Sequence, residues 1–305
     1  MHLSSLLEQK RRTRRNLVRE ALALAAIAPL ARAGLRPTSA RAQEGGVSLP
    51  DGRYYDAYVP TTTKEGQFYH YTCEFDAAWV VLSTFGYDVG FEEQLGIVGH
   101  DTSIEPYYEE TPEGFFIYGG DIIEAYSGDY YENFLARCTG SAMMPLFAEY
   151  NLEAYPVRDR AGIEQTLDQG GLVWTKATAD FLPWADTIWV TPGGEQLPTV
   201  LGNDHAVVVM GYNDFGPVIR DVLGPTSSNW ERLYEYDISW DTFLGVFNAQ
   251  DADGIGVMPP GVSAAQTAQT SQAEPSANTI EPPAGVGSAG ASDIIQPSEP
   301  QQVCC

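Results

Sequence analysis

The spacing of apolar residues changes partway along this chain, and that change limits the fold more than any other feature. In the stretch from Glu74 to Phe85 they fall at positions 77, 78, 81, 82 and 85, which is typical of one face of a helix. After Gly170 and Gly171 the apolar runs become short and β-like. Helices followed by strands predict an α+β fold, in which N-terminal helices pack on a C-terminal antiparallel β-sheet.

Turn residues and periodicity place the individual elements. Predicted helices cover residues 74–85, 91–98, 141–150, 162–168 and 240–247, and Pro145 is assigned to the first turn of its helix. Predicted strands cover residues 172–178, 187–191, 205–212, 218–222 and 233–236. Because Asn213 to Gly216 is a turn signal, the strands on either side of it should form an antiparallel hairpin. Residues 106–128 are interpreted as a long loop with short elements.

Both ends of the chain are expected to lie outside the folded domain. Residues 1–42 combine a basic start, a short apolar stretch and a small-residue cleavage site, so they predict an export signal peptide. Residues 43–60 are interpreted as an extended lead-in and residues 61–260 as the domain. Residues 261–305 are rich in Ser, Ala, Gln and Pro and predict a disordered low-complexity tail.

The export signal also predicts a location. Thr13 to Arg19 resembles the twin-arginine motif, so the twin-arginine export machinery is an expected partner. The apolar stretch from Ala21 to Ala31 is too short for a membrane span, which needs about 20 residues. We therefore expect a secreted or extracytoplasmic protein, in the periplasm or at the cell surface, with no stable membrane span after cleavage.

The charge of the chain argues against two classes of partner. Without residues 1–42, the sequence keeps 8 basic and 39 acidic residues, a formal charge of −31. Such a surface repels nucleic acid and anionic membranes. It is compatible with attracting cationic peptides and, more simply, with solubility outside the cell, so it describes the environment of the protein more than its reaction.

Cys73 is the first candidate for chemistry, because it stands where the helix at 74–85 begins. The positive end of a helix favours a thiolate and can lower a thiol pKa to roughly 3.5–7.5. A structural disulfide with Cys138 is the alternative, since export usually leads to an oxidising compartment. The adjacent Cys304 and Cys305 lie in the predicted tail and cannot be read as a disulfide framework.

His205 and Asp221 are the candidate partners of this thiol. Of the four histidines, only His205 opens a strongly β-like run, and it follows Cys73 by 132 residues. In one class of cysteine peptidases the partner residues come about 130–150 positions after the nucleophile. Asp221 follows 16 residues later on the neighbouring strand of the predicted hairpin, where it could orient the imidazole. An ordinary strand-edge histidine and an ordinary turn carboxylate are the simpler readings.

Acyl transfer also needs a hydrogen-bond donor for the oxyanion. The backbone N–H of Cys73 is one candidate, and the side chain of Gln67, six residues upstream, is the other; a solvent-exposed loop glutamine is the alternative reading. Glu74 and Asp76 are interpreted as first-turn acids that favour the helix dipole. Asp204 is expected to shape the strand entrance or to contact substrate, not to catalyse.

Several segments together resemble cysteine peptidase family 39, the bacteriocin-leader-processing peptidase-like branch of the papain-like superfamily. Tyr71 to Glu74 and Gly86 to Val89 resemble its nucleophile segment, and Asp204 to Tyr212 its histidine strand. Val218 to Asp221 resembles its aspartate strand, and Gly224 to Phe243 is similar to the closing part of stand-alone exported members. The resemblance spans about residues 60–250.

This resemblance implies a papain-like fold and a Cys–His–Asp triad of Cys73, His205 and Asp221, with Gln67 in the oxyanion hole. The sequence departs from the family where Val222 replaces a common proline and where Glu74 replaces the glycine of transporter-linked members. No transporter domain is expected, so cleavage of double-glycine leaders is not supported, and residues 105–140 look idiosyncratic.

The sequence therefore predicts an exported cysteine peptidase that acts on a peptide or protein substrate. A non-catalytic binding module on the same scaffold and a thiol acyltransferase stay open as alternatives; in the binding module the aromatic stretch at residues 107–131 would be the contact surface. The cysteines and histidines show no metal-binding spacing, and no phosphate-binding glycine loop or dinucleotide fingerprint occurs. No metal and no cofactor are expected.

Overall fold

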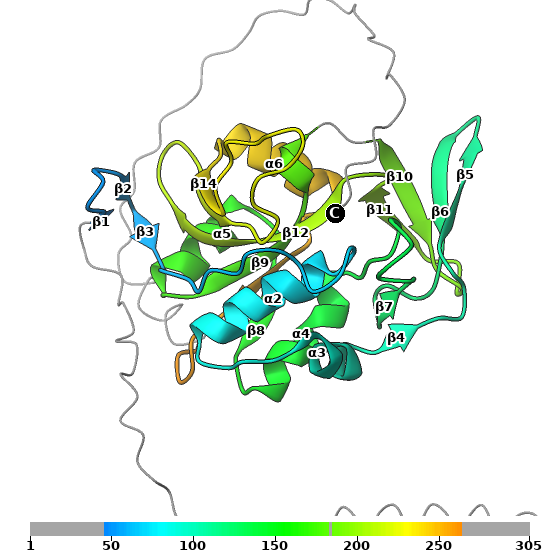
Figure 1. Cartoon of the computed structure of the whole chain (residues 1–305), viewed down its shortest axis with the longest axis horizontal. Helices are drawn as coiled ribbons and strands as arrows, with labels where there is room; N and C mark the ends of the chain where they lie inside the picture. The colour runs from blue at the N-terminus through cyan, green and yellow to red at the C-terminus, as the bar shows by residue number, and fades with distance from the viewer. Residues whose placement is uncertain (1–45, 183–184, 264–305) are drawn as a thin grey trace, which may run out of the picture. The chain divides into compact units, whose positions relative to one another are not determined.

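The computed structural model describes residues 46–182 and 185–263 of the chain (Figure 1). The predicted export signal at residues 1–42 lies outside these described residues, as does the predicted tail from residue 264 onward, including Cys304 and Cys305. Among the helices of the described ranges, none combines the length and the apolar character that crossing a bilayer requires.

The main sheet has seven strands, in the order β14-β13-β12-β9-β15-β8, with β3 paired to β12. Its neighbouring strands pair antiparallel throughout. Its central strands β9 and β12 are buried along almost their whole length, which explains why apolar residues predominate in both. The strands are β3 (Ala57–Tyr58), β8 (Ala154–Val157), β9 (Leu172–Thr178), β12 (Asp204–Tyr212), β13 (Pro217–Arg220), β14 (Glu235–Asp237) and β15 (Gly254–Val257).

The predicted hairpin is confirmed as β12 and β13. Val208 lies opposite Arg220 and Val209 opposite Ile219, with an irregularity between Val209 and Gly211. In the connecting turn, the Oδ1 atom of Asn213 accepts hydrogen bonds from the backbone N–H groups of Phe215, at 3.0 Å, and Gly216, at 3.2 Å. This side chain stabilises the turn locally, which is why the turn could be recognised from sequence.

Helices cover both faces of the main sheet (Figure 1). On one face, Phe75 and Leu146 pack in one core cluster with Trp174 of the sheet. On the other face, Phe243 packs in a second cluster with Val207. The predicted α+β arrangement, with N-terminal helices on an antiparallel sheet, is confirmed, and α5 and α6 add a layer behind it. The helices are α2 (Cys73–Thr84), α3 (Phe91–Val98), α4 (Gly140–Glu149), α5 (Arg160–Asp168) and α6 (Trp240–Ala249).

A second sheet of four strands lies beside the main one, in the order β11-β10-β6-β5 (Figure 1). Residues 106–128, interpreted as a long loop with short elements, do contain short elements, but two of them, β5 and β6, form an antiparallel hairpin that the sequence did not indicate. Stacked rings of Tyr107 and Tyr118, 5.4 Å apart, stabilise this pair across the strands. The strands are β5 (Tyr107–Thr111), β6 (Gly114–Tyr118), β10 (Asp186–Val190) and β11 (Gln196–Val200), with β6 and β10 parallel.

Two further details differ from the sequence interpretation. Pro145 lies inside α4, which begins at Gly140, and not in its first turn. The segment read as a lead-in carries β1 (Val47–Ser48), β2 (Tyr54–Tyr55) and β3, and β3 extends the main sheet. A two-stranded parallel pair, β4 (His100–Asp101) and β7 (Tyr126–Ser127), completes the described strands.

Replacing Trp174 should destabilise the protein severely, because its ring is fully buried between α2 and the sheet and its Nε1–H donates to the Glu74 carbonyl at 3.0 Å. We expect Trp174→Ala to lower the free energy of unfolding by about 3–5 kcal/mol. Trp230→Ala is the control, since that side chain is 76% exposed and its loss should cost less than about 0.5 kcal/mol. Equal effects in urea unfolding would contradict the described packing.

Candidate active site

The start of α2 is held by Asp76, which the sequence suggested was only a dipole-favouring acid. Its carboxylate accepts hydrogen bonds from the Thr72 hydroxyl at 2.7 Å and from the Phe68 backbone N–H at 3.0 Å. The Lys64 ammonium lies 3.1 Å from the same carboxylate. Asp76 therefore fastens the segment from residue 64 to residue 72 onto the first turn of α2, and so fixes where Cys73 begins the helix.

Gln67 lies between two anchored neighbours. The Gly66 N–H donates to the carbonyl of Val222 at 2.8 Å, and the Phe68 N–H donates to Asp76. The segment thus joins the residue after Asp221 to the helix turn that carries Cys73. The Gln67 Nε2 atom is buried and makes no hydrogen bond to any described residue. This amide is a donor that the described residues leave available.

The structure brings Cys73, His205 and Asp221 together. All three are buried, with the Cys73 side chain only 3% exposed. The Nε2 atom of His205 is hydrogen-bonded to Oδ1 of Asp221 at 2.8 Å. The imidazole of His205 also lies close enough to the Cys73 thiol to oppose the rise in its pKa that burial and the Glu74 charge cause. Because Nε2 binds Asp221, Nδ1 is the ring nitrogen to which a thiol proton would pass.

Sheet register explains why His205 and Asp221 meet. In the hairpin, Val209 is opposite Ile219, so counting two residues outward on each strand places Asp221 beside Val207. His205 is two residues from Val207, and alternate residues of a strand project to the same face. The two side chains are therefore diagonal neighbours on one face of the sheet.

Groups other than the His205 imidazole also hold Asp221. Its Oδ1 atom also accepts from the Leu223 backbone N–H at 2.8 Å, and its Oδ2 atom accepts from the Tyr236 hydroxyl at 3.0 Å. The Arg232 guanidinium lies 3.4 Å from Oδ2. Burial alone would raise the pKa of this carboxyl, but His205, Arg232 and the Leu223 amide together lower it to about 2. Asp221 is thus a stable anion that can orient His205.

Arg232 and its partners were not found from the sequence. Its guanidinium donates to the carbonyl of Gly224 at 2.9 Å and 2.6 Å and forms an ion pair with Asp180. Arg232 therefore fastens the segment that follows Asp221. The sequence signal for Arg232 was that only 8 basic residues remain after residue 42. The structure shows that Arg232 is one of the buried ones.

Glu74 lies in the first turn of α2, as expected, but its role is not only to favour the helix dipole. It is fully buried, and its Oε2 atom lies 3.3 Å from the Cys73 sulfur. Burial and the Glu74 charge raise the pKa of the Cys73 thiol well above its ordinary value, although His205 and Lys176 act in the opposite direction. The lowered thiol pKa expected from the helix N-terminus is therefore wrong for this structure.

A chain of buried charges extends from Glu74. The Lys176 ammonium lies 2.6 Å from Oε1 of Glu74 and 2.6 Å from Oδ2 of Asp204. Arg137 lies 3.8 Å from the same Asp204 oxygen. Asp204, expected at the strand entrance, is therefore engaged in holding Lys176. The sequence signal for Lys176 was a single lysine inside the apolar strand 172–178.

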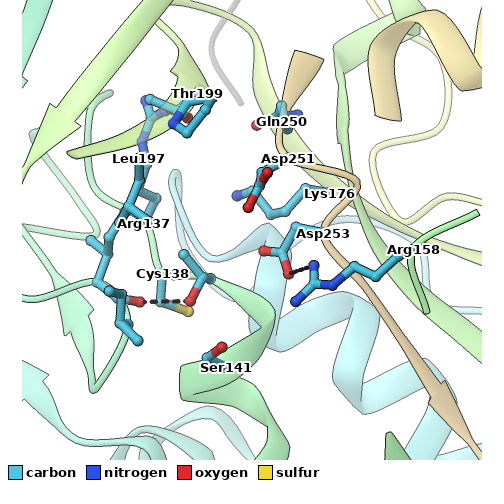
Figure 2. A pocket seen from close by; sticks show the side chains of 14 residues that line it. Arg137, Cys138, Ser141, Arg158, Lys176, Leu197, Thr199, Gln250, Asp251 and Asp253 are labelled. Atoms are coloured by element: carbon cyan, nitrogen blue, oxygen red, sulfur yellow. Dashed lines mark hydrogen bonds and ion pairs between the residues drawn. The ribbon is translucent and has the colours of Figure 1, made fainter. Parts of the chain in front are cut away.

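Figure 2 shows a pocket beside these charges, with the Lys176 side chain reaching into it. Its wall includes Leu197 of β11 and Ser141 of α4, so the pocket lies between the second sheet and the end of the main one. Cys138 also lines it. Cys138 and Cys73 are both free, buried thiols, and the disulfide alternative does not describe this structure. Within the described ranges, no three His, Cys, Asp or Glu side chains gather as a possible metal site.

The described part of the chain is thus an α+β protein with a buried thiol at a helix start beside a histidine–aspartate pair. No family model matches the chain, and no curated protein matches its sequence. Among solved structures, its fold is similar to a crystal structure from Bacillus anthracis provisionally named a C39-like peptidase. The two share 16% identity, and the match covers 66% of this chain and 96% of that chain with a TM-score of 0.51. A likeness at this identity concerns the fold alone.

The depressed pKa of Asp221 predicts how stability changes with acid. A carboxyl with a folded-state pKa of about 2 and an ordinary value of 3.8 stabilises the fold above pH 4 and loses that contribution as the pH falls through 2. We expect the difference in unfolding free energy between the wild type and Asp221→Asn to shrink by about 2 kcal/mol between pH 5 and pH 2. Urea unfolding across this range measures it, and a constant difference would show that Asp221 is not held as described.

Proposed function

We propose that this chain is a papain-like cysteine peptidase that hydrolyses peptide or amide bonds. The observation that carries the proposal is the convergence of Cys73, His205 and Asp221, with His205 bonded to Asp221 at 2.8 Å and acting on the thiol. A thiol, an imidazole and an orienting carboxylate in contact are the parts that nucleophilic acyl transfer needs. The similar fold of a protein provisionally named a peptidase adds support.

In the proposed reaction, the Cys73 sulfur attacks the substrate carbonyl carbon while the thiol proton moves to Nδ1 of His205. The bond from Nε2 to Asp221 holds the ring and stabilises the imidazolium that forms. His205 then gives its proton to the leaving amine, and a thioester on Cys73 remains. Water, activated by the same imidazole, hydrolyses the thioester and regenerates the thiol.

The oxyanion would be stabilised by two donors. The backbone N–H of Cys73 is in the first turn of α2, where amides have no intrahelical partner. The buried Nε2 atom of Gln67 is the second donor, and it makes no other hydrogen bond to the described residues. Both come from segments that Asp76 holds together, so their relative position is fixed before substrate binds.

Two other functions use the same scaffold. A binding module without turnover is favoured by the exposed aromatic side chains of the second sheet and its surroundings, where Tyr107, Tyr108 and Tyr131 are each about half exposed. A thiol acyltransferase would use the same residues with an amine in place of water in the second step. The export that residues 1–42 suggest stays a prediction for each of these functions.

Covalent labelling tests the proposed nucleophile. A peptide-based electrophile should modify the folded wild-type protein at one thiol, and Cys73→Ala should abolish the modification. Cys138→Ala is the matched control, because it removes the other buried thiol of the described ranges and should leave labelling unchanged. Intact-mass and peptide mass spectrometry give the readout. Labelling that survives Cys73→Ala, or a wild type that stays unmodified, would exclude the peptidase and favour the binding module.

Gln67→Ala tests the oxyanion donor. Removing one such donor typically lowers kcat about 10²–10³-fold, so we expect a loss of that size in hydrolysis of a peptide substrate with KM little changed. Gln196→Ala, at an exposed position of β11, is the control and should have the wild-type rate. A kcat in Gln67→Ala within about twofold of the wild type would remove Gln67 from the proposed mechanism.

A further inference from the structure

We propose that Glu74 is a positioning residue that keeps the Cys73 thiol protonated in the resting protein, and that Lys176 holds Glu74 in place to do so. This inference rests on the proposed function, because it concerns the control of the proposed nucleophile. It assigns a task to a buried carboxylate that the reaction described above does not use.

The geometry gives the thiol two competing acceptors. The sulfur is 3.3 Å from Oε2 of Glu74, so the thiol hydrogen can be donated to this carboxylate. The same hydrogen must pass to His205 when the sulfur attacks a carbonyl. Since a thiol has one hydrogen, a bond to Glu74 and a bond to His205 exclude each other. Glu74 therefore opposes the resting thiolate–imidazolium pair on which many cysteine nucleophiles depend.

Lys176 determines which oxygen of Glu74 meets the thiol. Its ammonium binds Oε1 at 2.6 Å, which leaves Oε2 facing the sulfur. Asp204 binds the same ammonium at 2.6 Å and so restrains it. In addition, the Glu74 backbone carbonyl accepts from Trp174 at 3.0 Å, which fixes the residue from its main chain. With both ends held, Glu74 has little freedom to leave the thiol.

The other ionisable groups around the thiol come from several elements. His205 and Asp204 belong to β12, Lys176 to β9 and Tyr126 to β7. Arg137 and Cys138 precede α4, and Asp253 precedes β15. Among these groups, Glu74 is the carboxylate that accepts a hydrogen bond from the Cys73 thiol, so its removal should change the protonation of Cys73 most.

The test is the pH dependence of Cys73 alkylation by iodoacetamide, followed on the Cys73 peptide by mass spectrometry in the folded full chain. For the wild type we expect a rate that rises about tenfold per pH unit between pH 6 and 8, without a plateau below pH 7. In Glu74→Gln the profile should move to lower pH by at least about one unit, so that the rate at pH 6 rises about tenfold or more. Limited access of iodoacetamide to the buried sulfur lowers the alkylation rate at every pH and leaves the shape of the pH profile unchanged.

Glu92→Gln is the matched control, because it removes the same charge from an exposed position of α3 and should keep the wild-type profile. A Glu74→Gln profile that coincides with that of the wild type would overturn the inference. If Glu74→Gln does not fold, the wild-type profile still tests the inference. A wild-type alkylation rate that reaches a plateau below pH 7 would show a resting thiolate and overturn it. Failure of the proposed function appears separately, as absent labelling by the peptide-based electrophile, and leaves the iodoacetamide profile readable.

Discussion

The pairing of β12 with β9 and β13 is the constraint on which the whole site depends. On one side it places His205 opposite Ala177 and Ala206 opposite Lys176 of β9. On the other side its hairpin with β13 brings Asp221 to the histidine. A slip of one residue in either register would turn the side chains to the other face and separate these groups. The buried apolar residues between them, on both faces of β12, hold the register.

Burial then determines how the charges behave. Charged groups that lose water must pair, and the described residues pair Glu74 with Lys176, Lys176 with Asp204, and Asp221 with His205 and Arg232. Each pairing restrains a side chain near the thiol. The same burial raises the pKa of the Cys73 thiol, so the helix N-terminus alone does not decide its protonation. Reactivity at this site depends on which neighbour receives the thiol proton.

The parts predicted from sequence were those encoded locally. The start of the helix at Cys73, the run after His205 and the Asn213 turn each have nearby signals, and they were enough to place His205 beside Asp221. Contacts between distant segments were not accessible in this way. Lys176 meets Glu74 across 102 residues, and β6 pairs with β10 across a long stretch of chain, so neither leaves a local pattern. The predicted lowering of the Cys73 thiol pKa was wrong for the same reason, because this pKa depends on burial and on the orientation of Glu74.

The central claim is that Cys73, His205 and Asp221 act as one unit, and a double-mutant cycle tests it most directly. The quantity to measure is the rate at which a peptide-based electrophile acylates Cys73 in the wild type, His205→Ala, Asp221→Ala and the double variant. If Asp221 acts only through His205, the double variant should be no slower than His205→Ala alone. Losses that multiply in the double variant would show that the two residues act independently and would contradict the account.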